Sequence, residues 1–396
     1  MLSVSEALSK LFALAPTMPE ETVPLDYAAG RVLLKTVSAR RDQPPFAASA
    51  MDGYAVHASS ATAGATLTVV DEAAAGHRAS GALPPGGAIR IFTGAPVPCG
   101  ADSILIQENA TRSDNRITVL EPPIRGQFIR PAGGDFKTGF EVFAPRRLTA
   151  RDVALLAAMN LPTVRVARQP VIALIPTGDE LVLPGGEPGP DQILSSNNFG
   201  LAAILSSIGG RPLQCPIARD TPDSVRQAFA AAKGADFIIS LGGASVGDHD
   251  LVADVMQGEG LSLDFHKIAM RPGKPLMAGR LGGAMMIGLP GNPVSALVCG
   301  EIFLRPTIEH CLGLPSGERR REVAILSHDL CKNGPREHYM RACLTEAAAG
   351  LPNVEVFESQ DSSRLATLAQ ADALVVRSPN APAASKGEQV EVISLS

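Results

Sequence analysis

The chain has 396 residues, a formal net charge of −5 and a mean hydropathy of +0.13. This length predicts two or more domains, and 45% hydrophobic residues supply sizeable cores, which excludes global disorder. The acidic balance, the lack of Trp and the low aromatic content argue against a nucleic-acid-binding surface.

The N-terminal residues predict an amphipathic helix, because Val4, Leu8 and Leu11 fall on one face. Glu6 and Lys10 interrupt the stretch, so it is not a secretory signal. The most apolar window, 281–300, is broken by prolines and glycines and does not predict a membrane span. The cysteines and histidines show no metal-ligand spacing and no disulfide framework. We therefore expect a cytoplasmic protein.

The next segment, 42–56, combines a Pro-Pro entry with the turn signal Asp52-Gly53. It suits a linker in which Asp52 caps a turn, and equally a loop over a ligand. From about residue 55 to 134, short β-prone runs alternate with Gly/Pro breaks and predict a small β domain. Thr93 and Asp135 lie in such breaks, and Thr93 alone reads as structural.

Residues 148–159 predict a helix with Thr149 at its start and Asp152 three residues later, as in a capping box. From 171 to about 314, apolar strands alternate with helical stretches, which is typical of a doubly wound parallel sheet. After 315, several short β-prone runs predict a second β domain or barrel.

Three apolar strands in the α/β region end in glycine or proline followed by polar residues. One ends at Gly242 and Gly243, followed by Ser245 and Asp250; the others lead to Glu180 and to the G-N-P turn after Pro290. Parallel strands present their carboxyl ends at one edge, so these turns predict a shared crevice. Glycines there allow backbone N–H groups to approach an anionic ligand.

Two further groups flank this region. Asp220 precedes a helix, where an acid favouring the helix dipole is the simplest interpretation when the residue is taken alone. Lys267, Arg271 and Lys274 gather around a Pro-Gly turn in otherwise apolar sequence, which favours contact with a phosphate or oxyanion.

Together these motifs resemble the molybdopterin molybdenumtransferase family, the MoeA proteins and the gephyrin E domain. The resemblance runs nearly end to end through PPFAASAMDGYAV, IFTGAPVPCGAD, IPTGDEL, GGASVGDHD, RPGKP and LPGNPVSA. It implies a multidomain α/β and β fold: a central doubly wound molybdopterin-binding α/β domain, an inserted small β domain and a C-terminal β-barrel. The implied domains are 1–45 plus 135–169 as a linking domain, 46–134 as the inserted β domain, 170–314 as the α/β domain, and 315–396 as the barrel.

The resemblance also implies an activity: insertion of molybdate into adenylylated molybdopterin, with release of AMP and use of Mg²⁺. It implies catalytic roles for Asp52, Glu180, Asp220 and Asp250, with Asp220 and Asp250 as metal ligands. It implies that the following positions bind molybdopterin or molybdate: Thr93, Asp135, Gly242, Gly243, Ser245, Lys267, Arg271, Lys274, Pro290, Pro293, Arg341 and Ser362. A homodimer is implied, in which the loop of Asp52 reaches the partner's site, together with contact with the adenylyltransferase of the preceding step.

The sequence departs from the family pattern at Gly134, Leu241, Asp361 and the run 195–198. Two other functions compete with molybdate insertion. The first is adenylation of molybdopterin, and the second is a non-catalytic molybdopterin-binding scaffold. The retained acids and both β domains favour insertion.

Overall fold

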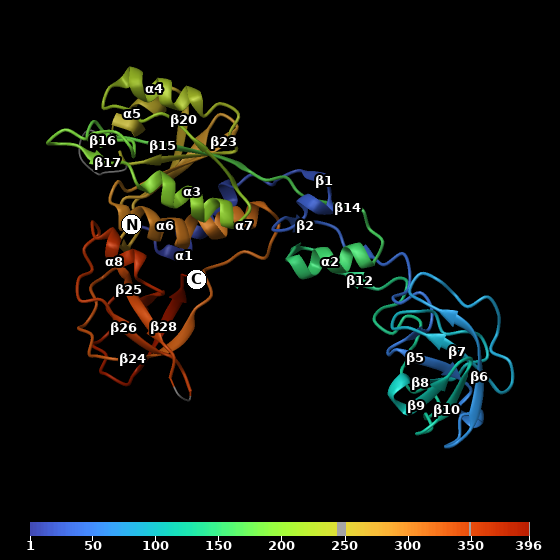
Figure 1. Cartoon of the computed structure of the whole chain (residues 1–396). Helices are drawn as coiled ribbons and strands as arrows, with labels where there is room; N and C mark the ends of the chain where they lie inside the picture. The colour runs from blue at the N-terminus through green and yellow to red at the C-terminus, as the bar shows by residue number, and fades with distance from the viewer. Residues whose placement is uncertain (244–250, 348–349, 396) are drawn as a thin grey trace.

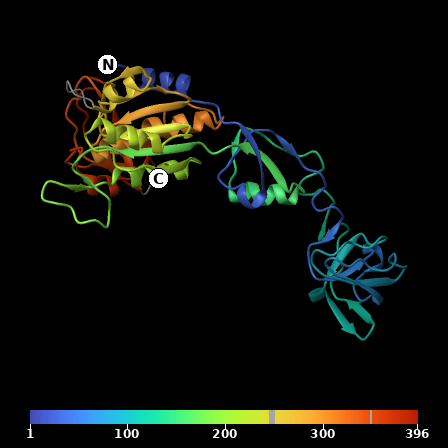
Figure 2. The same ribbon diagram turned by 90° about the horizontal axis from the view of Figure 1, so that it is seen from above.

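The computed structural model describes residues 1–243, 251–347 and 350–395. The molecule is elongated and bent, as Figures 1 and 2 show from two directions. The α/β domain and the C-terminal barrel lie side by side at one end. A small β domain lies at the other end, and a linking region joins the two.

The α/β domain is built on a six-stranded sheet of order β18-β15-β19-β23-β22-β20. The first four strands are parallel, β22 runs antiparallel to them, and β20 at the edge pairs antiparallel with β22. Their bounds are β18 Arg211–Gln214, β15 Val171–Pro176, β19 Phe237–Leu241, β23 Ala284–Leu289, β22 Met277–Leu281 and β20 Leu261–His266. Successive residues of β15 enter different cores: Ile172 and Leu174 pack on one face, and Ala173 and Ile175 on the other. Burial on both faces explains the continuous apolar runs, and the predicted doubly wound sheet is confirmed.

Helices cover both faces of this sheet. One face holds α1 Val4–Leu14, α3 Asn197–Ser207, α6 Pro293–Cys299 and α7 Arg305–Cys311, with a π-helical turn at Gly300–Leu304; the other holds α4 Pro222–Ala231 and α5 Leu251–Gly258. The predicted first helix is present, but Val4, Leu8 and Leu11 enter the core of the α/β domain. They are not part of the core of the linking region, to which residues 1–45 were expected to belong. No helix in the described ranges is long and apolar enough to cross a membrane.

The linking region has its own small core around Leu33, Leu156 and Val166. Its sheet has the order β1-β14-β2-β13, with β1 Glu20–Pro24, β14 Thr163–Ala167, β2 Val32–Leu33 and β13 Arg146–Arg147. Helix α2, Ala150–Ala158, begins with the predicted capping box between Thr149 and Asp152.

The small β domain is a six-stranded sheet of order β8-β5-β7-β6-β10-β9. The strands are β5 Gly53–Val56, β6 Thr66–Ala73, β7 Gly87–Ile91, β8 Ser103–Ile106, β9 Ala110–Ser113 and β10 Arg116–Val119. Two short ladders connect it to the linking region: β4 Ala48–Ser49 with β11 Ile129–Arg130, and β3 Val37–Ser38 with β12 Glu141–Val142. The β domain predicted from alternating short apolar runs is therefore present.

The C-terminal strands close into a five-stranded barrel, because β25 pairs with both β26 and β27. The strands are β24 Glu322–Leu326, β25 Glu337–Thr345, β26 Asn353–Val356, β27 Ala373–Arg377 and β28 Gln389–Ser394, with a short helix α8 at Leu365–Ala369. A two-residue strand of the α/β domain, β21 Met270–Arg271, adds to the edge of this barrel beside β25. The two domains therefore share a backbone hydrogen-bond ladder.

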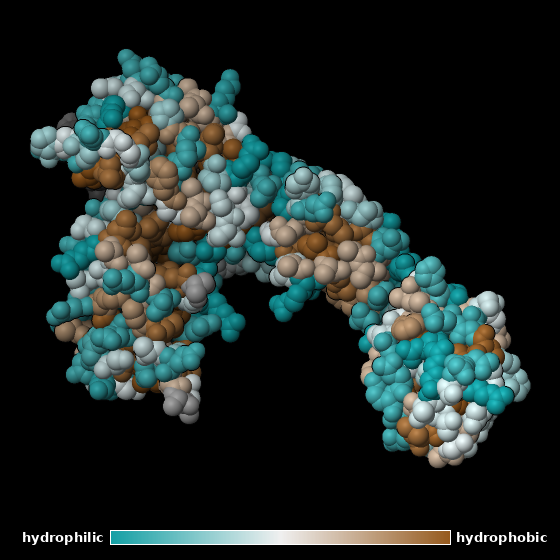
Figure 3. Space-filling model, viewed as in Figure 1, coloured by the Kyte–Doolittle hydropathy of each residue, from teal (hydrophilic) through white to brown (hydrophobic). Residues whose placement is uncertain are grey.

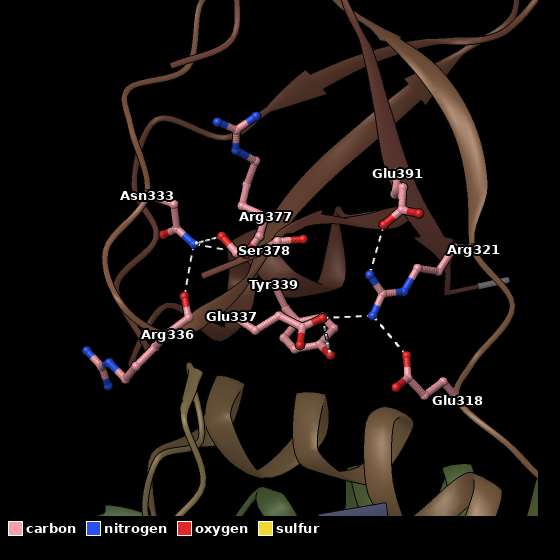
Figure 4. Close-up of polar contacts among 9 residues, drawn as sticks. All are labelled: Glu318, Arg321, Asn333, Arg336, Glu337, Tyr339, Arg377, Ser378 and Glu391. Atoms are coloured by element: carbon pink, nitrogen blue, oxygen red, sulfur yellow. Dashed lines mark hydrogen bonds and ion pairs between the residues drawn. The ribbon is translucent and has the colours of Figure 1, made fainter. Parts of the chain in front are cut away.

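Arg321 organises the start of the barrel (Figure 4). Its guanidinium donates to Glu318 at 2.9 Å, Glu337 at 2.8 Å and Glu391 at 2.8 Å. The Tyr339 hydroxyl also donates to Glu337, at 3.2 Å, and the Tyr339 ring lies in the core of the α/β domain. The network thus joins the interdomain segment, two barrel strands and the neighbouring domain.

Arg321→Ala is expected to lower the free energy of unfolding by about 2 kcal/mol, because partly buried carboxylates lose charge-assisted hydrogen bonds. Urea unfolding followed by circular dichroism measures this change. Arg320→Ala is the matched control, since its side chain is 88% exposed and should have little effect. Equal stability of the two variants would contradict the assigned role of Arg321.

Candidate active site

A cavity of about 890 Å³ opens at the carboxyl edge of β15, β19 and β23. Backbone bonds hold these strand ends together: the Thr177 N–H donates to the Leu241 carbonyl, and the Gly242 N–H donates to the Leu289 carbonyl, both at 3.0 Å. The predicted crevice is therefore present. It brings together these predicted site residues: Glu180, Asp220, Gly242, Gly243, Pro290 and Pro293.

Gly242 lies in the crevice wall, at a position where no side chain fits. Its φ is +107°, and a Cβ would lie 2.6 Å from the Thr177 hydroxyl oxygen and 2.9 Å from the Thr177 carbonyl oxygen. Only glycine allows the turn after β19 to pass this close to β15. The backbone of this turn therefore lies open to a ligand.

Glu180 depends on a second glycine. A Cβ at Gly178 would lie 2.2 Å from a carboxylate oxygen of Glu180, so this side chain folds back over the Gly178 backbone. Gly178 also has a φ of +138°. The T-G-D-E sequence thus places the Glu180 carboxylate at the crevice.

Asp220 lies on the turn that enters α4, where Thr221 caps the helix by accepting from the Ser224 N–H at 3.3 Å. The Asp220 N–H donates to the Asp179 carboxylate at 3.0 Å. Within the described ranges, the carboxylates of Glu180 and Asp220 form no hydrogen bond or ion pair. Both are therefore available to a ligand or a cation.

The predicted cations lie on the loop that connects β20 to β22. The Ile268 N–H donates to the Lys274 carbonyl at 3.0 Å, so the backbones around Lys267 and Lys274 lie side by side. Arg271 lies on β21, beside the barrel. Pro275 of the same loop lines the crevice. Among the residues that the structure describes, none of the three cations has an ion-pair partner.

His338 pairs with Arg271 across β21 and β25 and is buried. Burial, together with the nearby charges of Arg271, Arg336 and Arg341, lowers the pKa of His338 to about 4. The imidazole is therefore neutral in the folded protein at pH 7, next to a set of cations.

This depressed pKa predicts a loss of stability in acid. The unfolded chain gains a proton on His338 below pH 6.5, whereas the folded chain does so only near pH 4. Between pH 7.5 and 4.5, the wild type should lose about 2 kcal/mol more than His338→Gln. Urea titrations at both pH values measure this difference, and the exposed His266→Gln serves as the control. A His338→Gln variant that follows the wild type across this range would refute the prediction.

Arg341 is only 1% exposed and binds the protein itself. Its guanidinium donates to the carbonyls of Ser359 and Arg364, both at 3.1 Å. These bonds hold the loop 359–364. This loop contacts the α/β domain, because the Val294 N–H donates to the Ser362 carbonyl at 3.1 Å. Arg341 and Ser362 therefore lie at the domain junction near the crevice.

Asp52, Thr93 and Asp135 lie elsewhere, where the small β domain meets the linking region. The Asp52 carboxylate accepts from the Thr93 N–H at 2.7 Å and from its hydroxyl at 2.8 Å. These bonds lower the pKa of Asp52, so it stays ionised. Asp135 lines a separate cavity of about 710 Å³, together with Gly94 and Arg130.

The predicted site residues thus fall into two groups, one around the crevice of the α/β domain and one where the small β domain meets the linking region. These two parts lie well apart in the elongated molecule (Figure 1). Ser245 and Asp250 lie outside the described residues. Thr177 and Asn197 also line the crevice and were not predicted as site residues from the sequence. The Asn197 side chain donates to the Gly291 carbonyl at 2.7 Å. A polar residue at a predicted helix start, beside the strand ends, was the available signal.

The fold and the crevice define a multidomain α/β protein with a ligand site at the carboxyl edge of its sheet. Family models match three successive parts of the chain: "MoeA N-terminal region (domain I and II)" over 2–160, "Probable molybdopterin binding domain" over 173–310, and "MoeA C-terminal region (domain IV)" over 323–395. The chain belongs to the MoeA family.

Individual relatives agree with this assignment. A molybdopterin molybdenumtransferase of Nostoc sp. is 36% identical over 100% of this chain and 94% of its own length. That of Haemophilus influenzae is 33% identical over 99% and 98%. A solved molybdopterin biosynthesis MoeA protein from Pyrococcus horikoshii covers 100% of both chains, with a TM-score of 0.80 at 26% identity.

Proposed function

We propose that this chain is a transferase of molybdenum cofactor biosynthesis that inserts molybdate into adenylylated molybdopterin and releases AMP. The observation that carries the proposal is the crevice, where two free carboxylates face a glycine-lined strand edge. The neighbouring loop supplies Lys267, Arg271 and Lys274 to neutralise phosphate and molybdate charge.

The chemistry follows from this arrangement. The backbone at Gly242 and Gly243 approaches the pterin phosphate, and the cations bind its charge. Cleavage breaks one P–O bond of the phosphoanhydride, and AMP leaves with an oxygen from either water or molybdate. A carboxylate at Glu180 or Asp220 accepts the proton when water is the nucleophile.

Mg²⁺ fits the donor set at this crevice. Mg²⁺ sites commonly use one or two carboxylates together with substrate phosphates, and Asp220 and Glu180 are both free to act as such ligands. Within the described ranges no group of three or more acidic, histidine or cysteine side chains could hold a metal alone. The ion would therefore bind together with the substrate, with Asp220 and Glu180 as candidate protein ligands, and would stabilise the phosphate charge.

We propose that the protein acts as a homodimer with a shared site. Within one chain, Asp52, Thr93 and Asp135 lie where the small β domain meets the linking region. The ribbon views show this junction far from β15, β19 and β23, whose ends form the crevice (Figures 1 and 2). A second copy of the chain would bring such a group to the crevice of the first. Helix α2 supplies an apolar surface for this contact, since Ala154 and Ala157 are exposed and only Asp152 and Leu156 are buried. Figure 3 shows apolar residues gathered over this linking region.

The two alternative functions explain less of the structure. Adenylation of molybdopterin would require only the α/β domain, and would leave the two β domains of this chain without a role. A non-catalytic scaffold would not require the free carboxylates that line the crevice. The four-part division is supported by separate cores in the α/β, linking, small β and barrel regions. We also propose that the chain acts in the cytoplasm and receives its substrate from the adenylyltransferase of the preceding step.

The test is release of AMP from adenylylated molybdopterin, with and without molybdate and Mg²⁺. Release that requires molybdate supports the proposed insertion. Formation of adenylylated molybdopterin from ATP would instead establish the adenylyltransferase. Tight binding of molybdopterin without turnover of any kind would leave the scaffold as the function.

A further inference from the structure

Arg219 joins the two segments that carry the free carboxylates. One nitrogen of its guanidinium, Nη1, donates to the carbonyls of Gly178 at 3.2 Å, Asp179 at 2.9 Å and Leu181 at 3.0 Å. These three carbonyls flank Glu180 on both sides. A single side chain therefore holds the backbone around this acid.

The backbone of residues 219 and 220 also forms hydrogen bonds with α4 and with the Glu180 loop. The backbone N–H of Arg219 donates to the Ser224 hydroxyl at 2.9 Å, which fixes Arg219 to the start of α4. The Asp220 N–H donates to the Asp179 carboxylate at 3.0 Å, from the opposite direction. Arg219 has no ion-pair partner in the described part of the chain, so its charge is directed at the carbonyls. Charge-assisted hydrogen bonds of this kind are roughly twice as strong as neutral ones.

The loop around Glu180 is also held by backbone bonds, from the Gly178 N–H to the Ala218 carbonyl at 2.9 Å and from the Ile193 N–H to the Glu180 carbonyl at 2.8 Å. Gly178 adopts a φ of +138°, and the chain continues into a two-residue ladder between β16 Leu181–Val182 and β17 Ile193–Leu194. Both residues of β17 are exposed, so this ladder has little core beneath it. The three bonds from Arg219 thus add a side-chain link between the Glu180 loop and the turn that carries Asp220.

We propose that Arg219 is a positioning residue that sets the separation of the Glu180 and Asp220 carboxylates. Its role rests on the proposed function, because both acids act there on the phosphoanhydride and its cation. Arg219 acts through the backbone of the Glu180 loop and through its neighbour Asp220. A displacement of about 1 Å in such a site can lower a rate roughly 10²-fold.

The experiment compares Arg219→Ala, Arg219→Lys and the control Arg226→Ala. Arg226 lies on α4, the helix that follows Arg219, and it pairs with Asp223 and Glu259 outside the crevice. We expect Arg219→Ala to lower kcat for AMP release about 10²-fold, with KM changed much less. Lysine keeps the charge and offers three donors, so Arg219→Lys should retain activity within about tenfold of the wild type. Millimolar guanidinium should partly restore Arg219→Ala and leave Arg226→Ala unchanged.

A second readout does not depend on turnover. Hydrogen exchange measured by mass spectrometry should be faster in peptides covering 177–183 of Arg219→Ala, and unchanged in Arg226→Ala. Wild-type exchange over 177–183, or a wild-type kcat, in Arg219→Ala would overturn the proposal. So would an equal loss of kcat in Arg219→Ala and Arg219→Lys without rescue by guanidinium. If the wild type itself releases no AMP, the proposed function fails, and the exchange measurement still decides whether Arg219 holds the loop.

Discussion

Asp220→Asn is expected to lower kcat for molybdate-dependent AMP release by about 10³-fold, since removing an acid–base or charge-stabilising group costs 10²–10⁴. Asparagine keeps the size of the side chain and the backbone bond from residue 220 to Asp179, so the turn should persist. What is lost is the charge that faces the substrate and its cation. Initial rates at saturating molybdate and Mg²⁺ measure the effect.

Asp223→Asn is the matched control for this experiment. Asp223 lies three residues away on α4, and its side chain is 88% exposed and paired with Arg226. It should retain wild-type kcat. If Asp220→Asn remains as active as Asp223→Asn, Asp220 has no catalytic role and the assignment of the crevice as the site of turnover fails.

Placing two glutamates on α2, as Ala154→Glu with Ala157→Glu, is expected to give a folded monomer with less than about 1% of wild-type activity. Both positions are exposed in the single chain and glutamate is a good helix former, so the monomer fold should be retained. Burying like charges at a two-fold contact is unfavourable for both copies. Sedimentation velocity reports the oligomeric state, and circular dichroism reports the fold.

Ala230→Glu, on an exposed face of α4, controls for the added charge and should stay dimeric. A complementation assay tests the shared site directly. Asp52→Ala and Asp220→Ala subunits should each be inactive alone, but random mixing should restore about a quarter of wild-type activity through heterodimers with one intact site. An active monomer, or mixed subunits without activity, would contradict a site made by two copies.

Local sequence patterns were sufficient for the elements and for the crevice. The apolar runs that end at Pro176, Leu241 and Leu289 predicted neighbouring parallel strands, and these strands are neighbours. Thr149 and Asp152 predicted a helix start, because a capping box is a contact between residues close in the chain. Such contacts can be inferred without knowledge of the tertiary structure.

Contacts between distant segments could not be predicted in the same way. Helix α1 shows an apolar face, but nothing in its sequence says that this face packs against α7 and the α/β core. Arg219 stands beside Asp220 in the sequence, yet its partners are carbonyls about 40 residues earlier. Backbone carbonyls carry no residue-type signal, so a side chain that binds them leaves no motif to read.

The ladder between β21 and β25 means that the covalent linker is not what holds the barrel to the α/β domain. Met270 and Arg271 pair with Glu337 and His338, and Tyr339 enters the neighbouring core. A protease that cuts the chain between 315 and 320 should therefore leave two fragments that remain associated through gel filtration. The same two fragments, expressed as separate chains, should likewise reassemble into a functional unit. The fragment that carries the α/β domain alone would present an open strand edge at β21 and tend to aggregate.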